Sequence, residues 1–412
     1  MGAYYLDWLN LFFRWFHVIA GVAWIGASFY FVWLDMSLQK PPEWKAKKGI
    51  SGDLWAVHGG GFYEIAKYKL EPEEMPKTLH WFKWEAYTTW LTGMAMLAIV
   101  YYANATAYLV DPTKVAFSNM EAIAVSLAFL FGSYLIYELI VRSHIGKNKL
   151  VFSITIFVLM VIATWGSYQL FSDRASFIHV GAILGTIMAG NVFFGIMPAQ
   201  RALVDCVRKG EKPGPDVAAL ALMARNRSVM NNYFTLPLIF IMISNHYPMM
   251  YSHAHGWLVL VFVGIITATA RHFFNEKHLG RNKPGYLIVP AIATLALIFW
   301  MRPAPIEAAP VAPVTSETTT DTAAGAVPVT ASGDDAVMAI VQERCSTCHA
   351  AQPTQAGFNA PPLGVILATP ADLKTHKAKI VTSLQTSYMP LGNITKMTDE
   401  ERAQVLAYTS AL

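Results

Sequence analysis

Long apolar runs separated by short polar connections dominate the chain up to residue 301. A run of about 20 apolar residues can cross the hydrocarbon core of a bilayer as a helix. We expect a helix at each of the following runs: residues 11–34, 83–103, 119–141, 150–171, 176–197, 231–247, 254–274 and 285–301. The sixth is the weakest, because it contains Pro237 and ends in polar groups. The pattern predicts a mainly α protein with an eight-helix transmembrane bundle over residues 1–301.

Basic residues are unevenly distributed between the connections. The connections after runs one, three, five and seven are rich in lysine and arginine. Those after runs two, four and six, with the start of the tail, hold only Lys114, Arg174 and Arg302. Lysine- and arginine-rich loops stay in the cytoplasm, so we expect both chain ends outside it. The first run has no preceding basic residue and no following small-residue cleavage site, so we expect it to remain a helix rather than be removed as a signal peptide.

Composition separates the bundle from the rest of the chain. Hydrophobic residues make up 54% of the chain and charged residues 14%, whereas soluble domains average about 25% charged. Residues 302–335 are mostly Pro, Ala, Thr and Ser, too poor in large apolar side chains to fold, and are expected to form an extended linker. Residues 336–412 are expected to form a small all-α domain. The net charge of +4 comes from the basic connections that indicate the membrane orientation, so no nucleic-acid partner is expected.

The small domain carries a motif with specific chemistry. Cys345, Cys348 and His349 form a Cys-x-x-Cys-His sequence, which attaches c-type haem. The two thiols bind the porphyrin covalently, and the histidine is the proximal iron ligand. A zinc site would need a second pair of ligands, and the only other cysteine, Cys206, is distant in sequence. The motif therefore predicts a cytochrome c domain. Because c-type haem is attached in the periplasm, this agrees with the orientation inferred from charge.

The second iron ligand is expected downstream. Cytochromes c use a methionine there, and Met389 and Met397 are the candidates. Met389 precedes a proline in a loop, whereas Met397 directly precedes Thr398, which with Glu401 reads as a capping box that opens the last helix. We expect Met389 to be the ligand and Met397 to pack beneath the cap.

The first basic connection has an unusual composition. It contains His58, followed by three glycines, then Lys67. His80, Trp84 and Glu85 lead into the second helix, with Trp55, Trp81 and Lys83 nearby. Glycines let the backbone turn tightly or approach a ligand closely, and aromatic rings beside charged groups can hold a flat heterocycle. An ordinary loop with interfacial aromatics remains an equal alternative. The glycines are not a dinucleotide fingerprint, because no strand–turn–helix context surrounds them.

These segments carry a family resemblance. The first helix from Arg14 to Gly26, the loop from His58 to Tyr63, and the stretch from Leu79 to Glu85 resemble the membrane-bound urate oxidase (urate hydroxylase) family of bacterial purine catabolism. The resemblance implies an eight-helix domain joined to a cytochrome c in the bacterial inner membrane. It also implies hydroxylation of urate to 5-hydroxyisourate without hydrogen peroxide. Electrons would pass through haem c to a respiratory cytochrome oxidase or a soluble cytochrome c.

Substrate-site candidates can be chosen from that chemistry. Removing a proton from urate requires a base, for which His58, His80 and Glu85 are candidates. Trp84 is a candidate stacking platform, and Lys67 a candidate partner for the anion. Each of these residues taken alone is more simply structural. The alternative function is a non-catalytic membrane cytochrome that relays electrons from a quinol or another dehydrogenase.

Histidines inside the membrane add a further possibility. A site at the cytoplasmic face would lie about 30 Å from an outer haem, so either the substrate site lies deep in the bundle or a second carrier bridges the gap. Intramembrane histidines are functional candidates, and His17 with His179 would suit a b-type haem or another metal. Hydrogen bonding to backbone or water is the simpler role for both. Arg14 is expected to reach outer headgroups, and Asp35 and Glu138 are expected to be solvated helix ends.

Overall fold

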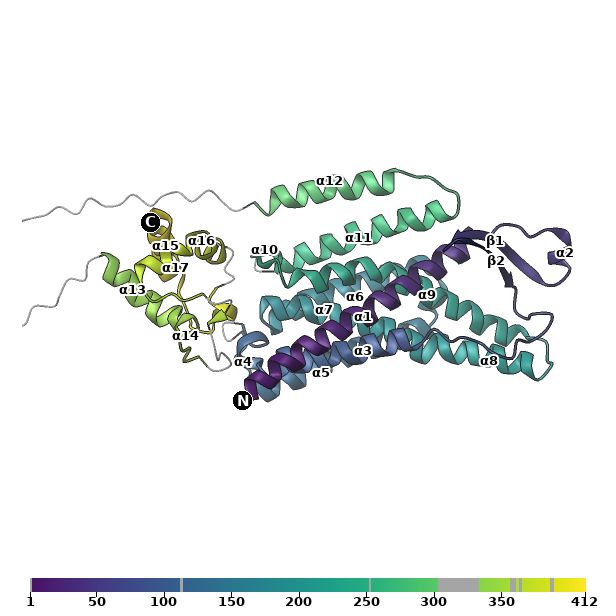
Figure 1. Ribbon diagram of the computed structural model, residues 1–412, viewed down its shortest axis with the longest axis horizontal. Helices are drawn as coiled ribbons and strands as arrows, with labels where there is room; N and C mark the ends of the chain where they lie inside the picture. Colours follow the sequence, from purple (N-terminus) through teal and green to yellow (C-terminus); the bar gives the residue numbers. More distant parts are fainter. Residues whose placement is uncertain are drawn as a thin grey trace, which may run out of the picture.

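The chain is described by a computed structural model that covers residues 2–111, 114–251, 253–302, 333–355, 361–362, 365–385 and 389–412. Figure 1 shows a long helical bundle, built from the residues up to 302, and a small helical unit built from those after 332. The predicted linker at 302–335 lies mostly outside the described residues.

Each apolar run coincides with a helix of the bundle. These helices are α1 (Gly2–Ser37), α3 (Trp84–Met96), α5 (Asn119–Arg142), α6 (Lys149–Leu170), α7 (Asp173–Gly190), α9 (Pro215–Ser244), α11 (Gly256–His278) and α12 (Gly285–Trp300). Three shorter helices stand in the connections: α2 (Glu43–Ala46), α4 (Ala105–Tyr108) and α10 (Pro248–Tyr251). The protein is therefore mainly helical, as the apolar pattern predicts.

Several of these helices suit a bilayer. Within the described residues, five segments are long and apolar enough to cross one: Trp8–Ser37, Asn119–Arg142, Lys149–Leu170, Asp173–Arg208 and Gly256–His278. The helix α12 is apolar but has only 16 residues. The helix α9 begins at Pro215, well before the predicted run at 231–247, and Pro237 lies inside it without ending it. The helices are compatible with a membrane protein.

Two stretches of π-helix interrupt the bundle. The first, η1 (Leu97–Tyr102), continues α3. The second, η3 (Asn191–Ile196), joins α7 to α8 (Met197–Arg208), so the fifth helical segment runs past its predicted end at 197. π-Helical turns are rare, and those that do occur are often found at functional sites.

The first basic connection is a β-hairpin, which corrects the expectation of a loop. Strands β1 (Ile50–His58) and β2 (Gly61–Tyr68) pair antiparallel. Gly59 and Gly60 form the turn with φ of 56° and 82°, a region that glycine adopts without steric cost. The glycines after His58 therefore serve the turn.

A buried polar network lies between α5, η3 and α9, and it corrects the expectation that Glu138 is solvated. Arg227 donates to both carboxylate oxygens of Glu138, at 2.7 and 2.9 Å, and to Asn191 Oδ1 at 3.0 Å. Asn191 also bonds Tyr137 and Asn231. Arg227 needs room beside Gly195, where a Cβ would lie 2.5 Å from the arginine Cδ. Asp35 is also paired, with Lys67 and Arg225.

The small unit has a core of its own. Its helices are α13 (Gly333–Arg344), α14 (Ser346–His349), α15 (Pro370–Thr375), α16 (Lys377–Gln385) and α17 (Asp399–Ala411), with a 3-10 turn η5 (Leu391–Asn393). Val341, Leu373 and Val405 are buried at its centre with Met397. The predicted capping box of Thr398 with Glu401 opens α17 and is confirmed. Met397 is a core residue, as expected.

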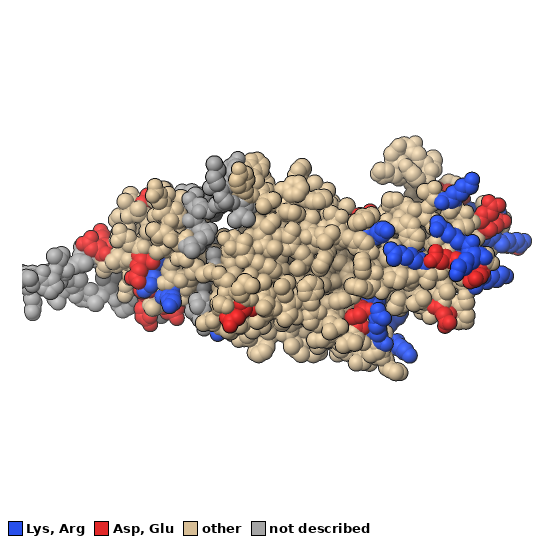
Figure 2. All heavy atoms as spheres, turned by 90° about the horizontal axis from the view of Figure 1, so that it is seen from below, with Lys and Arg blue, Asp and Glu red and all other residues tan. Residues whose placement is uncertain are grey.

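The two ends of the bundle differ in charge. Lysine and arginine gather at the end formed by α2, the hairpin and the last turn of α8, which we call the basic end (Figure 2). The opposite end carries α4, and there α4 contacts η5 of the small unit.

Candidate functional site

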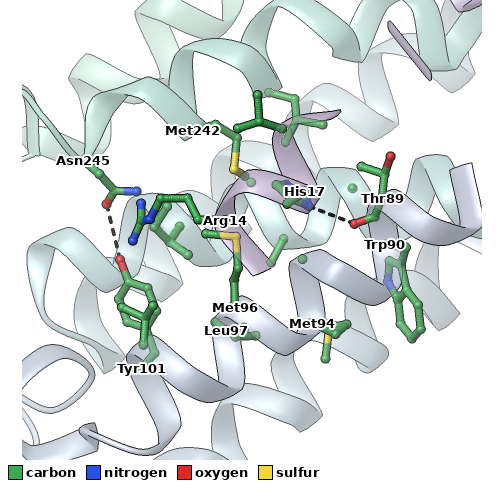
Figure 3. A pocket seen from close by; sticks show the side chains of 18 of the residues that line it. Arg14, His17, Thr89, Trp90, Met94, Met96, Leu97, Tyr101, Met242 and Asn245 are labelled. Carbon is green, nitrogen blue, oxygen red and sulfur yellow. Dashed lines mark hydrogen bonds between the residues drawn. The ribbon is translucent and has the colours of Figure 1, made fainter. Parts of the chain in front are cut away.

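A cavity of about 360 Å³ lies inside the bundle between α1, α3 with η1, α7 and α9. Figure 3 shows the labelled side chains of Arg14, His17, Trp90, Tyr101 and Asn245 around it. It reaches toward the end of the bundle near the small unit, because Arg174 lies in the first turn of α7 and Asn245 directly follows α9. A pocket of this size, mostly apolar with a few polar groups, is typical of a small-molecule site.

Two arginines give the cavity a positive character. Arg14 and Arg174 both line it, and no aspartate or glutamate is found among the described residues that do so. Arg174 Nε donates to Asn245 Oδ1 at 3.2 Å, and the Tyr101 hydroxyl donates to the same oxygen at 3.3 Å. Arg14 therefore faces a cavity, which corrects the expectation that it reaches the headgroups. Paired guanidinium groups in an apolar wall favour a flat anion.

His17 stands at the middle of the cavity wall in a defined tautomer. Its Nδ1 lies 3.0 Å from the carbonyl oxygen of Thr89 and 3.0 Å from the Thr92 hydroxyl. A carbonyl can only accept, so Nδ1 carries the proton and Nε2 has a free lone pair. Gly93 makes room for the ring, since a Cβ there would lie 3.1 Å from His17 Cε1. In its neutral form, His17 therefore presents Nε2 as its basic nitrogen.

The rest of the wall is apolar or aromatic. Trp90 donates its indole N–H to Thr186 Oγ1 at 3.1 Å, which fixes its ring. Met94, Met96 and Met242 supply flexible, polarisable surface. The π-helical η1 contributes Leu97, Val100 and Tyr101 to the lining. A planar, anionic heterocycle matches this combination of walls and charges.

The residues proposed from the first connection do not line this cavity. His58 ends β1 and Lys67 lies on β2, both exposed, and Lys67 pairs with Asp35. His80 packs on Phe82 with ring centroids 4.5 Å apart. Trp84 is exposed, as are Trp55 and Phe82. Burial lowers the pKa of Lys67, and the charge of Arg225 lowers it further. The structure spreads these groups along the basic end rather than around one space.

Glu85 differs from its neighbours. It lies in the first turn of α3 and its Oε2 is buried without a hydrogen-bond partner among the described residues. Trp81 and Tyr87 pack nearby in a small apolar cluster with Ala86. Glu85 therefore lies apart from the cavity polar groups, on the side of the basic end.

The two histidines considered as haem or metal ligands, His17 and His179, contact different helices. His179 is fully buried, its Nδ1 donates to the Ala175 carbonyl at 2.7 Å, and its Nε2 lies 2.6 Å from the Ser126 hydroxyl. Its ring stacks on Phe171 at 4.2 Å. Both nitrogens are therefore engaged between α5 and α7, while His17 lies on the cavity. Among the described residues, no cluster of three or more His, Cys, Asp or Glu forms a metal site.

The haem motif has suitable local geometry. Cys345 and Cys348 lie one helical turn apart, and both are free thiols. His349 Nδ1 donates to the Val365 carbonyl at 2.9 Å, which orients the ring and leaves Nε2 available to a metal. Met389, half-buried, lies in the loop before η5. These donors fit a covalently attached iron porphyrin.

The thiols are protonated in this arrangement. Burial raises the pKa of Cys345 to about 11, and the neighbouring Cys348 adds to the shift. Burial also raises the pKa of Cys348. Neither sulfur therefore behaves as a reactive thiolate at neutral pH.

Sequence reasoning named His17 as a candidate haem or metal ligand but did not single out the two arginines that line the same cavity. Arg14 and Arg174 read as helix-end residues because each stands near the end of an apolar run. The available signal was the cost of a charge within a membrane segment, which marks functional positions. Asn245 gave no such signal, because it belongs to a polar turn at the end of α9.

Comparison with known proteins agrees with the position of the bundle. A family model described as "Urate oxidase N-terminal" matches residues 3–302. No curated protein matches the chain. No solved structure matches it either.

Proposed function

The chain belongs to the urate oxidase N-terminal family, and from that premise we propose that it oxidises urate within the cavity between α1, α3, α7 and α9. The product is 5-hydroxyisourate, and the electrons leave through a haem c held by the small unit. The observation that carries the proposal is the pairing of Arg14 and Arg174 around a space that also contains the neutral base His17.

The chemistry of the reaction accounts for each group. The urate monoanion and one water give 5-hydroxyisourate, two electrons and one proton. Arg14 and Arg174 bind and orient the anion, with Trp90 and the methionines against its faces. His17 Nε2 accepts the proton, since its Nδ1 already donates to Thr89. A low-dielectric wall strengthens each of these charge interactions.

The cofactor is assigned by the motif. Cys345 and Cys348 would hold a haem covalently, with His349 and Met389 as iron ligands, and the haem supplies a one-electron acceptor. Val365 fixes the histidine tautomer through its carbonyl oxygen. No oxygen-derived peroxide forms, because the electrons go onward to a respiratory cytochrome oxidase or a soluble cytochrome c.

We place the protein in a bacterial inner membrane with eight crossings and the basic end in the cytoplasm. The cavity then lies in the outer half of the bilayer. This position would shorten the path to the haem, and the contact of α4, at the outer end of the bundle, with η5 of the small unit supports it. An additional b-type haem at His17 and His179 is not part of the proposal, because the nitrogens of His179 are engaged.

The decisive experiment is anaerobic reduction of the purified full chain. We expect urate alone to reduce the haem c, as read from its absorption spectrum. A His349→Ala variant is expected to lose this reduction. Reduction by quinol but not by urate would overturn the enzyme assignment in favour of an electron-relay subunit.

The cavity assignment has a separate test. We expect Arg174→Gln to raise the KM for urate about 10- to 100-fold, which corresponds to a lost charged hydrogen bond of about 1.5–3 kcal/mol. Arg201→Gln is the matched control, because Arg201 is exposed near the basic end and does not line the cavity. Equal KM values for the two variants would place the urate site elsewhere.

A further inference from the structure

A second cationic group is buried in the bundle outside the cavity. Arg271, on α11, is only 5% exposed. Its guanidinium lies 4.0 Å from the centroid of the Phe29 ring on α1. Its Nε donates to Asn232 Oδ1, on α9, at 2.8 Å. Three helices therefore converge on this one charge.

Two N–H groups of this cluster have no acceptor. Arg271 Nη2 and Asn232 Nδ2 are both shielded from solvent and lack a hydrogen-bond partner among the described residues. Asn232 is 0% exposed, and its Oδ1 already accepts from Arg271. Orphaned buried donors are rare in folded proteins, and each costs about 1–3 kcal/mol. The two unpaired N–H groups therefore belong to Arg271 and Asn232, which are hydrogen-bonded to each other.

The charge of Arg271 also lacks a carboxylate. The acidic residue nearest to it along α11, Glu276, pairs with Lys283 at 3.1 Å and Arg281 at 3.6 Å. No ion pair of Arg271 occurs within the part of the chain that the structure describes. Arg227 shows the contrast, because Glu138 neutralises it through two hydrogen bonds. A buried cation with unmatched donors is a setting that favours an anion.

The cluster lies between the cavity and the basic end. Phe29 is five residues beyond Trp24, the cavity residue of α1 nearest that end, which is about 7 Å along a helix. Asn232 is six residues before Leu238, the nearest cavity residue of α9, or about 9 Å. The cluster therefore lies on the side of the cavity that faces the basic end.

We propose that Arg271 and Asn232 form an anion-binding station on the route to the cavity. The ligand accepts the Arg271 Nη2–H and the Asn232 Nδ2–H, while Phe29 covers one face of the guanidinium. Urate in passage and a small inorganic anion share this chemistry. The assignment of urate as the ligand rests on the proposed function, whereas the anion site itself does not.

The test measures thermal unfolding of the purified full chain without turnover. In gluconate, a bulky anion, the wild type carries an uncompensated charge and is expected to melt below an Arg271→Met variant. Chloride, or urate at lower concentration, is expected to raise the wild-type melting temperature and reverse that order. Arg271→Met leaves the cavity intact, so urate is expected to raise its melting temperature only through binding in the cavity.

Each outcome decides the matter. If the order of the melting temperatures of wild type and Arg271→Met does not depend on the anion, water alone accepts the two hydrogen bonds and the anion-binding station is overturned. Stabilisation by chloride but not by urate at this site would overturn the role in substrate passage. Asn232→Leu provides an independent variant, expected to weaken the same anion effect, with Arg225→Met as the control at an exposed arginine of α9.

Failure here is distinguishable from failure of the proposed function. If urate reduces the haem but the stability difference between wild type and Arg271→Met does not depend on the anion, only the anion-binding station is overturned. If the station does lie on the route, Arg271→Met is also expected to raise the KM for urate and leave kcat unchanged, since the lost interaction precedes chemistry.

Discussion

The ring of Tyr101 meets the ring of Tyr108 edge to face, with centroids 6.3 Å apart. Tyr101 lines the cavity, and Tyr108 belongs to α4, which contacts η5 of the small unit. The Arg174 guanidinium lies 5.2 Å from the Tyr108 ring, so one side chain touches both the cavity and this aromatic pair. The two rings therefore lead from the cavity to α4, the helix that contacts the small unit.

Replacing Tyr108 tests this connection. Loss of the ring in Tyr108→Leu leaves a gap between Tyr101 and the small unit, and we expect the haem to be reduced severalfold more slowly by saturating urate. Stopped-flow absorbance measures that rate, and equilibrium binding checks that urate affinity is kept. Tyr108→Phe retains the ring and is expected to stay near the wild-type rate. An unchanged rate in Tyr108→Leu would show that electrons leave by another route.

A change at His17 separates proton transfer from binding. His17→Asn keeps an N–H donor near Thr89 but removes the lone pair at Nε2. We expect kcat to fall by about 10²- to 10⁴-fold, the usual contribution of a general base, while KM changes little. Steady-state kinetics with purified protein provides the measurement. A loss confined to KM would make His17 a binding residue instead.

The helices could be predicted from the sequence, because each follows from a local pattern, whereas haem attachment at Cys345, Cys348 and His349 stays a prediction. Apolar runs located α5 and α6 closely, and Thr398 with Glu401 marked the start of α17. The cavity could not be predicted in this way. Arg14, Tyr101, Arg174 and Asn245 come from four distant segments, and only packing brings them together. The glycines after His58 allow either a tight turn or close approach to a ligand, and the structure uses Gly59 and Gly60 for the turn of a hairpin.

The ion pair of Arg227 with Glu138 is expected to stabilise the bundle rather than to act in catalysis. Arg227→Met leaves a buried carboxylate whose remaining charged partner, Arg142, is largely exposed. Breaking a buried pair costs about 3–5 kcal/mol, so we expect a clear fall in melting temperature with little change in KM.

Two comparisons make that prediction specific. The double variant Arg227→Met with Glu138→Leu removes both charges and is expected to recover much of the loss. Arg225→Met, two residues earlier on α9, breaks only an exposed pair with Asp35 and is expected to cost about 0–1 kcal/mol. Equal destabilisation by the two single variants would show that burial of Arg227 contributes nothing.

The small unit is expected to lose stability in acid through Glu401. Arg344 donates to both oxygens of this carboxylate, at 2.9 and 2.8 Å, and with the backbone N–H of the Thr398 cap it lowers the pKa of Glu401. A pKa that is lower in the folded state means that the stabilisation is complete at neutral pH and disappears as pH falls through the folded value. Glu401→Gln should therefore be less stable than wild type at pH 7, and the difference should shrink as the pH falls below the ordinary titration range of a glutamate. The measurement is the melting temperature of the small unit as a function of pH, followed by its haem absorbance.

Glu343→Gln is the matched control, because Glu343 pairs with the same arginine at 2.9 Å but is 67% exposed, so its profile should follow the wild type. Parallel profiles for wild type and Glu401→Gln would mean that other carboxylates, such as Asp372, whose pKa is lowered by Thr369, govern the acid response.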